Sequence, residues 1–319
     1  MKSDPERATS TWFIVAPAEA GLRADTLVGR HLFPSTAAAR RAMAAGLIGV
    51  DGRGAKKSDH LQAGQRVELA ETTRPAGVLE PTPELVLPVL YADAAIVAVA
   101  KPSGIPSHPL RRGDGATVAS ALVARYPECG GASPDPREGG LGHRLDIGTS
   151  GVIVAARSRE VWHRLREVLS APSCEKVYAA LAAGSFPGPD TVPKAYVAAG
   201  AVPHSWVVEC PIGRRGRRGA KVVLGSGRQP LPARTEVILV EPRAGSTLVE
   251  ARLAHGRAHQ VRAHLAYLGI PVLGDTLYNA AAQPDGGLHL HARSIAFVHP
   301  TSRQLLRIEA PLPAWARRA

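Results

Sequence analysis

The sequence predicts an α+β fold built around a largely antiparallel mixed sheet with flanking helices. Short segments rich in Val, Ile and Leu recur along the chain and have strand character, whereas few segments have helical spacing. Because these strands and helices do not alternate strictly, a doubly wound parallel sheet is disfavoured. Apolar residues make up 45% of the 319 residues, which is sufficient for a packed core.

We expect four parts along the chain: a tail at 1–19, a small α/β unit at 20–70, a linker at 71–88 and a larger domain at 89–313. Prolines at 75, 81, 83 and 88 disfavour regular structure in the linker. The small unit can bury little core, which is typical of an accessory module.

In the small unit, residues 22–32 and 36–45 are expected to form helices, and Gly46 is suited to end the second one. Strands are expected at 47–51 and 64–70. In the larger domain, the predicted strands are 96–100, 151–156, 176–182, 235–240, 247–253, 295–298 and 305–309, and the predicted helices are 117–126, 159–170 and 257–268.

The chain is strongly basic, with 39 Lys and Arg against 27 Asp and Glu and a net charge of +12. This excess favours a polyanionic partner such as nucleic acid. No stretch approaches 18 uncharged apolar residues, so no membrane partner is expected. The three cysteines form neither a disulfide framework nor a zinc knuckle, which is typical of a cytoplasmic protein.

Several common catalytic motifs are missing from the sequence. There is no GxxxxGK[ST] loop, no GxGxxG that opens a helix and no GxSxG elbow. His255 and His259 have the spacing of helical metal ligands, but they lack the glutamate of an HExxH motif, and Gly256 weakens a helix there. We therefore expect neither a metal nor a cofactor.

An acidic residue between glycines, Asp146, directly precedes an apolar strand in the segment GHRLDIGTSG at 142–151. An aspartate in this position commonly serves as a turn residue. Here Arg144 lies two residues away, and the flanking glycines permit close approach of a ligand. A carboxylate beside a guanidinium stays ionised, as a nucleophile or an electrostatic stabiliser requires.

Four segments of the chain, together with a closing strand, resemble the motifs of the RluA-type RNA pseudouridine synthases and follow one another in the order that this family shows. HRLDIGTSGVIVAARS at 143–158 resembles the family signature, and KPSGIPSHP at 101–109 precedes it. EKVYAALAAG at 175–184 and HGRAHQVRAHLAYLGIPVLGDTLYN at 255–279 follow it, and LHLHARSIAFVHP at 288–300 resembles the closing strand. The resemblance covers about residues 89–313 and implies the pseudouridine synthase fold.

The resemblance also implies roles for four residues. Asp146 matches the catalytic aspartate, Tyr178 the tyrosine that lies against the target base, and Arg262 the arginine that pairs with the aspartate. Arg144 matches the arginine associated with flipping the nucleotide out of the RNA. The chain departs from the family at Ala258, where Ser or Thr is usual, and at His255, where Thr is common.

The small unit resembles an S4 RNA-binding domain, which often precedes this catalytic domain. PSTAAARRAMAAGLIGVDG at 34–52 matches its helix–turn–strand core, with departures at Thr36 and Asp51. Basic residues in this unit and in a second basic run at 204–228 are the expected phosphate contacts: Arg40, Arg41, Lys56, Lys57, Arg214, Arg215, Arg217 and Arg218.

The implied function is the isomerisation of uridine to pseudouridine in structured RNA, with ribosomal RNA preferred and transfer RNA possible. The reaction oxidises nothing and imports no group, so it needs no cofactor. A monomer without an obligate protein partner is expected. Two alternatives stay open from the residues alone: a non-catalytic RNA-binding or ribosome-assembly protein that retains the fold, and a uridine N-glycosidase that releases uracil. Asp146 could act as a nucleophile or remove a 2′ proton.

Overall fold

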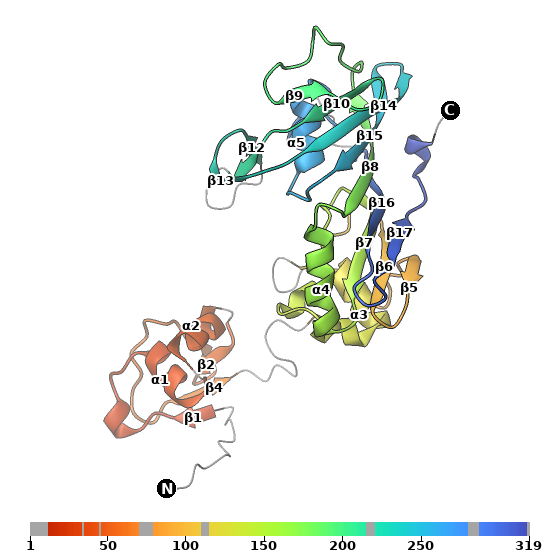
Figure 1. The fold of residues 1–319 in the computed structure, drawn as a ribbon. Helices are drawn as coiled ribbons and strands as arrows, with labels where there is room; N and C mark the ends of the chain where they lie inside the picture. Colours follow the sequence, from red (N-terminus) through yellow and green to blue (C-terminus); the bar gives the residue numbers. More distant parts are fainter. Residues whose placement is uncertain are drawn as a thin grey trace. The chain divides into compact units, whose positions relative to one another are not determined.

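The structure of the protein is a computed structural model, and it describes residues 12–33, 35–44, 46–69, 79–109, 115–214, 221–279 and 287–317. By their internal contacts, the residues divide into two compact units, Met1–Ala76 and Gly77–Ala319. Figure 1 shows the chain coloured from its N-terminus to its C-terminus. Within the described ranges, no helix is long and apolar enough to cross a membrane.

The first unit has two helices packed on a small antiparallel sheet. Its strands pair in the order β1-β4-β2-β3, and their bounds are β1 Trp12–Ile14, β2 Ile48–Val50, β3 Arg53–Gly54 and β4 Arg66–Leu69. The helices are α1 (Ala24–His31) and α2 (Thr36–Ala44), which confirms the helices predicted from the sequence. A short 3₁₀ turn, η1, lies at Pro17–Glu19.

Close contact between α1 and α2 depends on a glycine. A Cβ atom on Gly29 would lie 2.9 Å from the Cα atom of Thr36, a distance that side chains do not tolerate. The absence of a side chain lets the helices meet and bury Leu27 and Val28 against Val67 of the sheet. Gly46, with φ 70°, follows α2 in the left-handed conformation expected of a residue after a helix C-terminus.

The second unit is built on one large mixed sheet, in which strands pair in the order β5-β6-β7-β16-β8-β15-β14-β10-β9 and β17 also pairs with β16. Every pairing is antiparallel except that of β7 with β16, which is parallel. This arrangement confirms the predicted α+β class with a largely antiparallel sheet. The strands are β5 Val89–Ala92, β6 Ile96–Lys101, β7 Ser150–Ala156, β8 Glu175–Ala183, β9 Val197–Ala199, β10 Ser205–Val208, β14 Thr235–Arg243, β15 Ser246–Leu253, β16 Leu290–Val298 and β17 Leu305–Glu309.

At one end of this sheet, two helices cover opposite faces. Side chains alternate between the two faces of a strand, so Val154 of β7 joins the core under α4 (Arg159–Ser170) while its neighbour Ile153 joins the core under α3 (Val118–Arg125). Because both faces are buried, β7 is a continuous apolar run, as its sequence predicts. Two 3₁₀ turns, η2 (Pro127–Gly131) and η3 (Pro136–Glu138), lead from α3 toward β7.

At the other end, α5 (Gln260–Tyr267) packs on β8, β14 and β15 (Figure 1). Val261 and Leu265 face the sheet, which leaves Arg262 at the edge of the buried stripe. The helix begins three residues after the predicted start at 257, so that prediction is wrong at its N-terminus. The reason is His259, whose left-handed backbone (φ 55°, ψ 17°) interrupts the helix before Gln260.

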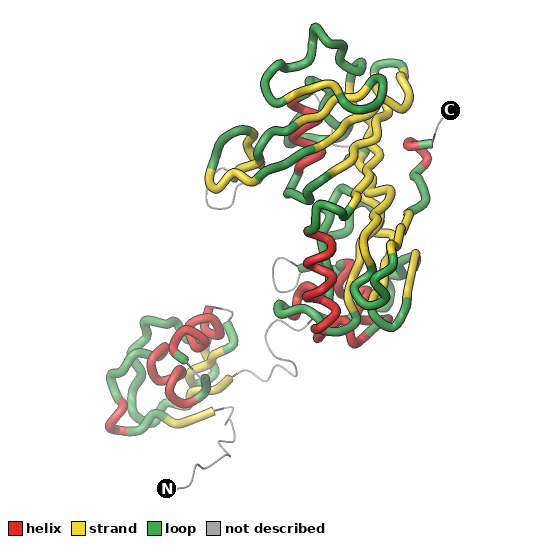
Figure 2. Tube along the Cα trace, viewed as in Figure 1, coloured by secondary structure: helices red, strands yellow, loops and turns green. Residues whose placement is uncertain are grey.

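A three-stranded sheet in the order β12-β11-β13 lies outside the main sheet, and the sequence did not predict its strands. These strands are β11 Ile212–Arg214, β12 Val222–Leu224 and β13 Arg228–Leu231. They are short, and two of them carry arginine, so no apolar alternation marks them. A last 3₁₀ turn, η5, spans Ala314–Ala316. Figure 2 shows that strands and loops make up most of the half of the second unit that contains these strands.

Candidate active site

Asp146 lies in a tight turn just before β7, and the segment 101–107 holds the backbone of this turn. The hydroxyl of Ser107 donates to the carbonyl of Leu145 (2.8 Å) and accepts from the N–H of the same residue (3.0 Å). Ser103 Oγ donates to the carbonyl of Gly148 at 2.7 Å. The motif KPSGIPSHP therefore has a structural role here: it fixes the turn that carries the carboxylate.

The ammonium group of Lys101 is the centre of this support. Its Nζ donates to the carbonyls of Pro102 (3.0 Å), Ile147 (2.9 Å) and Thr149 (2.7 Å), and the residue is only 1% exposed. Burial lowers the pKa of Lys101 to about 8, and the negative charge of Asp146 opposes that shift. Three carbonyl acceptors compensate for the burial of the ammonium group.

Arg262 of α5 contacts Asp146 directly. Its Nη1 donates to Asp146 Oδ2 at 2.9 Å, although the two residues are 116 positions apart in the sequence. The side chain of Arg262 is 12% exposed and that of Asp146 is 29% exposed, so the pair lies at the floor of an accessible site. In such a setting, charge-assisted hydrogen bonds are stronger than those on a protein surface.

A second carboxylate, Asp275, fixes the other side of the guanidinium. Its oxygens accept from Arg262 Nε (2.7 Å) and Nη2 (2.8 Å), and its side chain is fully buried. Burial raises the pKa of Asp275, but the bonds and charge of Arg262 outweigh this and hold the pKa below its usual value. The backbone N–H groups of Leu277 and Tyr278 add to the same effect.

Tyr178 and Arg144 complete the set of predicted catalytic residues. Tyr178 lies on β8 and is half-buried; burial and the negative charge of Asp146 raise its pKa. Arg144 is exposed and lines the same cavity as Asp146. The guanidinium that bonds Asp146 is therefore that of Arg262, the partner that the family resemblance implied, rather than that of Arg144, its neighbour in the sequence.

The site opens into a cavity of about 500 Å³. Titratable side chains line it from three separate segments: His108 from the supporting segment, Arg144 and Asp146 from the turn, and His259, Arg262 and Asp275 from the α5 region. This space is large enough for a nucleoside-sized ligand. Across the described ranges, no group of three or more His, Cys, Asp or Glu residues could hold a metal ion.

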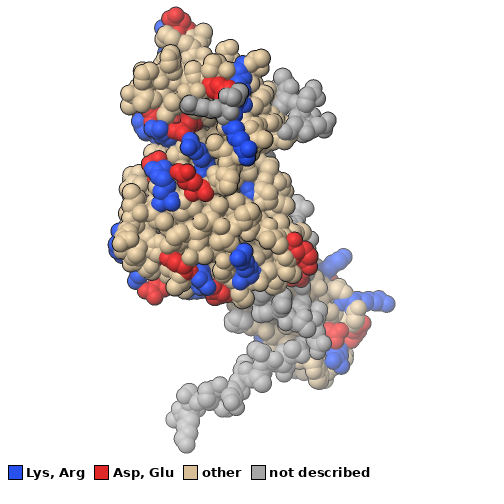
Figure 3. All heavy atoms as spheres, turned by 90° about the vertical axis from the view of Figure 1, so that its right-hand side faces the viewer, with Lys and Arg blue, Asp and Glu red and all other residues tan. Residues whose placement is uncertain are grey.

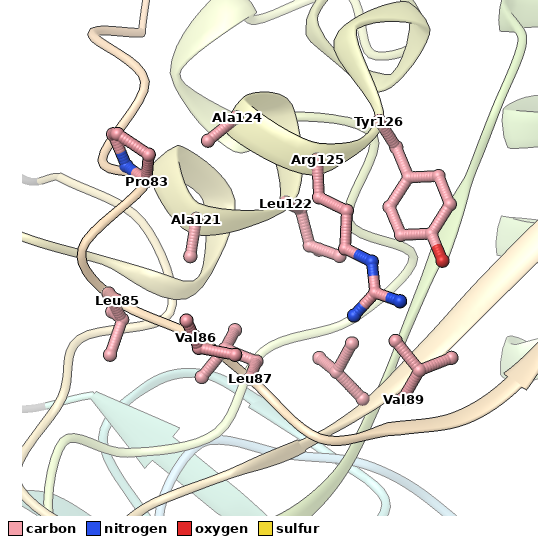
Figure 4. A pocket seen from close by; sticks show the side chains of 11 residues that line it. Pro83, Leu85, Val86, Leu87, Val89, Ala121, Leu122, Ala124, Arg125 and Tyr126 are labelled. Atoms are coloured by element: carbon pink, nitrogen blue, oxygen red, sulfur yellow. The ribbon is translucent and has the colours of Figure 1, made fainter.

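A smaller cavity of about 290 Å³ lies between the segment 83–89 and α3 (Figure 4). Its lining is mainly apolar, and Figure 4 shows Leu85, Val86 and Leu87 on one side and Leu122 on the other. Arg125 is the charged residue of that lining. The cavity offers no pair of groups for acid–base chemistry, so the cavity at Asp146 is the candidate active site.

The residues predicted to contact RNA are distributed over both units. Arg40 is exposed, yet its Nε donates to the buried carboxylate of Asp25 at 2.7 Å, so it also stabilises the first unit. Lys56 and Lys57 are exposed. The side chains of Arg41 and Arg214 and the whole of Arg215, Arg217 and Arg218 lie outside the described residues. On the face shown in Figure 3, basic and acidic side chains are interspersed.

Sequence reasoning did not assign roles to three residues of this site: Lys101, His259 and Asp275. All three lie within the segments that carry the family resemblance. A buried carboxylate such as Asp275 needs a cationic partner, but the sequence alone does not identify that partner as Arg262. The motifs therefore contained all three residues, but the sequence alone did not show which contacts these residues make.

Comparisons with known proteins identify the relatives of this chain. The family model described as RNA pseudouridylate synthase matches residues 95–267, more than half of the chain. An uncharacterized RNA pseudouridine synthase of Mycobacterium bovis is 34% identical over 92% of this chain and 92% of its own length. A ribosomal large subunit pseudouridine synthase D of Xanthomonas campestris pv. campestris is 31% identical over 98% of this chain and 92% of its own length.

Solved structures show the same fold. Human RNA pseudouridylate synthase domain containing 1 superposes with a TM-score of 0.54 at 22% identity, over 74% of this chain and 87% of that one. Human RNA pseudouridylate synthase domain containing 4 superposes with a TM-score of 0.51 at 24% identity, over 72% of this chain and 90% of that one. The family match and the similarity to these relatives show that the chain belongs to the RNA pseudouridylate synthases, enzymes that isomerise uridine to pseudouridine in RNA.

Proposed function

We propose that the chain modifies a uridine of large-subunit ribosomal RNA, with Asp146 as the group that acts at C1′ of the target nucleotide. The observation that supports this most directly is the 2.9 Å hydrogen bond from Arg262 to Asp146 on the wall of a nucleoside-sized cavity. The name of the Xanthomonas relative, a ribosomal large subunit enzyme, supports the choice of RNA.

The reaction breaks the bond between C1′ and N1, turns the uracil, and joins C5 to C1′. C5 loses a proton and N1 gains one, so substrate and product are isomers. In this proposal the hydrogen bond from Arg262 orients the Asp146 carboxylate for attack at C1′ or for removal of a 2′ proton. Asp275 keeps Arg262 in the orientation that serves Asp146.

Tyr178 is proposed to accept the C5 proton. Burial and the charge of Asp146 both raise the pKa of Tyr178, so the free enzyme holds a neutral phenol. The C5 proton is removed after C5 has joined C1′, when Asp146 is a free carboxylate again. In this proposal the phenol of Tyr178 therefore passes its own proton to N1 of the turned uracil and takes the proton from C5, so that the step balances.

RNA has to present the uridine outside its stack, at a cost of a few kcal/mol. We propose that Arg144, which is exposed on the cavity wall, occupies the space left by the flipped nucleotide. The S4-like unit predicted at 20–70, whose sheet also contains β1 (Trp12–Ile14), and the linker predicted at 71–88, of which Leu79 and Leu87 pack in the core of the second unit, precede the proposed catalytic domain at 89–313. The S4-like unit would add phosphate contacts through Arg40, Arg41, Lys56 and Lys57, and the basic run would add contacts through Arg214, Arg215, Arg217 and Arg218.

A monomer acting in the cytoplasm is part of the proposal. Asp146, Arg262, Asp275 and Tyr178 all come from one chain, and together they form the carboxylate, its cation, the anchor and the phenol. The proposed site therefore requires no residue from a second subunit.

The test is release of tritium from RNA labelled at C5 of uridine, with unmodified large-subunit ribosomal RNA and a transfer RNA pool assayed in parallel. Release from the ribosomal RNA alone is expected. Release from transfer RNA alone would overturn the choice of substrate, and free uracil among the products would indicate an N-glycosidase instead. The products should contain pseudouridine in an amount equal to the tritium released.

A further inference from the structure

His259 occupies a strained position at the edge of the cavity. Its backbone is left-handed (φ 55°, ψ 17°), which is uncommon for a residue with a side chain and costs about 1 kcal/mol or more. The neighbouring Gln260 stabilises this geometry: its Oε1 accepts from the N–H of Arg257 (3.0 Å), and its Nε2 donates to Thr235 Oγ1 (3.0 Å). Strain that is held in place in this way is common at functional sites.

The ring of His259 lies between Tyr278 and Asp146. Nδ1 is 3.2 Å from Tyr278 Oη, and the two rings meet edge-on, with centres 5.8 Å apart. On the other side, Nε2 is 3.8 Å from Asp146 Oδ2. This distance is too long for a hydrogen bond, so the ring faces the carboxylate across a narrow gap.

The hydrogen bonds around Tyr278 favour the tautomer of His259 that carries its proton on Nε2. The N–H of Val222 donates to Tyr278 Oη at 3.0 Å, and burial raises the pKa of Tyr278, so the phenol keeps its own proton to donate. The phenol can donate this proton to Nδ1 of His259, 3.2 Å away, and this arrangement is adopted below. In the neutral ring, the remaining N–H is then on Nε2, the nitrogen that faces Asp146.

The charges around the ring favour this neutral form. Burial lowers the pKa of His259, and the positive charges of Arg262 and Arg144 act in the same direction. Asp146 and Asp275 oppose them, and the net pKa lies below its usual value. A neutral imidazole at pH 7 therefore presents one donor, Nε2–H, beside an acceptor, the Asp146 carboxylate.

A donor and an acceptor 3.8 Å apart match the 2′-hydroxyl of a ribose. An oxygen at hydrogen-bond distance from both groups can accept from Nε2–H and donate to Asp146 Oδ2 at once. We propose that His259 binds the 2′-hydroxyl of the target uridine and, with Asp146, positions the ribose for reaction and distinguishes RNA from DNA at this nucleotide; this inference rests on the proposed function.

The test is a coupling between His259 and the 2′-hydroxyl. Short RNAs that carry either uridine or 2′-deoxyuridine at the target position are compared as competitors of tritium release from the labelled RNA. With the wild-type protein, removal of the hydroxyl should weaken binding about tenfold, the value of one hydrogen bond of about 1.4 kcal/mol. With His259→Asn, the uridine RNA should bind about tenfold more weakly, and removal of the hydroxyl should weaken it no further.

Asparagine is chosen because it tolerates the left-handed backbone, so the variant should fold. His204→Asn is the matched control: His204 is also left-handed (φ 54°) but is exposed in the turn between β9 and β10, so this variant should behave as wild type with both RNAs. Tyr278→Phe removes the hydroxyl that fixes the tautomer and should reduce the discrimination between the two RNAs without abolishing it.

Independent losses would overturn the inference: if His259→Asn and removal of the 2′-hydroxyl weaken binding about 100-fold together, the ring does not bind that hydroxyl. An unchanged affinity of His259→Asn for uridine RNA would overturn it as well. Failure of the proposed function looks different, because the wild-type protein would then release no tritium from any labelled RNA.

Discussion

Arg262 and Asp275 form a paired contact in which both carboxylate oxygens accept from the guanidinium, at 2.7 and 2.8 Å. The carboxylate of Asp275 is fully buried, so the arginine is held from behind while its Nη1 points to Asp146. Two acidic residues thus share one cation, but only Asp146 is exposed to substrate. This asymmetry supports the proposal that Asp146 acts on the substrate and that Asp275 positions Arg262.

Replacing Asp275 with Asn should release Arg262 from this orientation. The amide offers one acceptor where the guanidinium presents two donors, and the buried cation loses a charged partner. We expect the free energy of unfolding to fall by about 3 kcal/mol and kcat to fall at least tenfold, measured by urea unfolding and tritium release. Asp135→Asn is the control, since Asp135 forms a similar pair with Arg137 on the surface and should cost at most about 1 kcal/mol. Equal effects of the two changes would contradict this assignment.

Lys101→Met should loosen the turn that carries Asp146. The substitution keeps much of the side-chain volume but leaves the carbonyls of Pro102, Ile147 and Thr149 without their shared donor. We expect a loss of about 3 kcal/mol of stability and a lower kcat with little change in KM. Urea unfolding and steady-state tritium release check this. A stable variant with wild-type kcat would show that the turn needs no such support.

Arg144→Ala should leave the fold unchanged and impair the reaction. Arg144 is exposed on the cavity wall, so its removal should change the free energy of unfolding by less than about 0.5 kcal/mol. If Arg144 stabilises the flipped state, tritium release should fall while RNA affinity in a filter-binding assay changes little. Loss of affinity in proportion to activity would instead indicate a simple phosphate contact.

His264 should make the second unit less stable in acid. It is fully buried, its Nδ1 is 2.8 Å from Thr235 Oγ1 and its Nε2 is 3.1 Å from the carbonyl of Cys210, and burial lowers its pKa to about 4. Between pH 6.5 and 4 the unfolded chain binds a proton at this residue and the folded chain does not, so acidification favours unfolding.

The matched comparison is wild type against His264→Gln. The variant should be less stable at pH 7.5, but the difference between the two proteins should shrink by about 2 to 3 kcal/mol at pH 4.5. Urea unfolding followed by fluorescence in a Trp12→Phe background measures this, because the other three tryptophans lie in the second unit. A constant difference across this pH range would contradict a neutral buried imidazole.

Much of the fold follows from local sequence signals. The helix predicted at 159–170 matches α4, since Ser158 caps its N-terminus and Val161, Leu165 and Leu169 form one apolar face. Strand β16 begins at Leu290, five residues before the predicted start at 295, because histidine and arginine interrupt its apolar pattern. The predicted start of α5 at residue 257 was wrong because no local sequence signal reveals the left-handed backbone of His259.

The site was only partly predictable. The family resemblance implied the pairing of Arg262 with Asp146, which the structure brings to 2.9 Å. Neither Asp275 nor Lys101 could be assigned from spacing, because each acts through contacts that exist only once distant segments have folded together. Arg144 was the nearest cation to Asp146 in the sequence, yet Arg262 is the residue that bonds it.

The central claim is that the Asp146 carboxylate performs the chemistry, and Asp146→Asn tests it most directly. Tritium release from C5-labelled large-subunit ribosomal RNA should fall below detection in this variant, while its RNA affinity and free energy of unfolding stay close to wild type. The amide keeps the shape of the side chain and can still accept from Arg262, but it cannot act as a nucleophile or a base. Continued formation of pseudouridine by a folded Asp146→Asn protein would contradict the account.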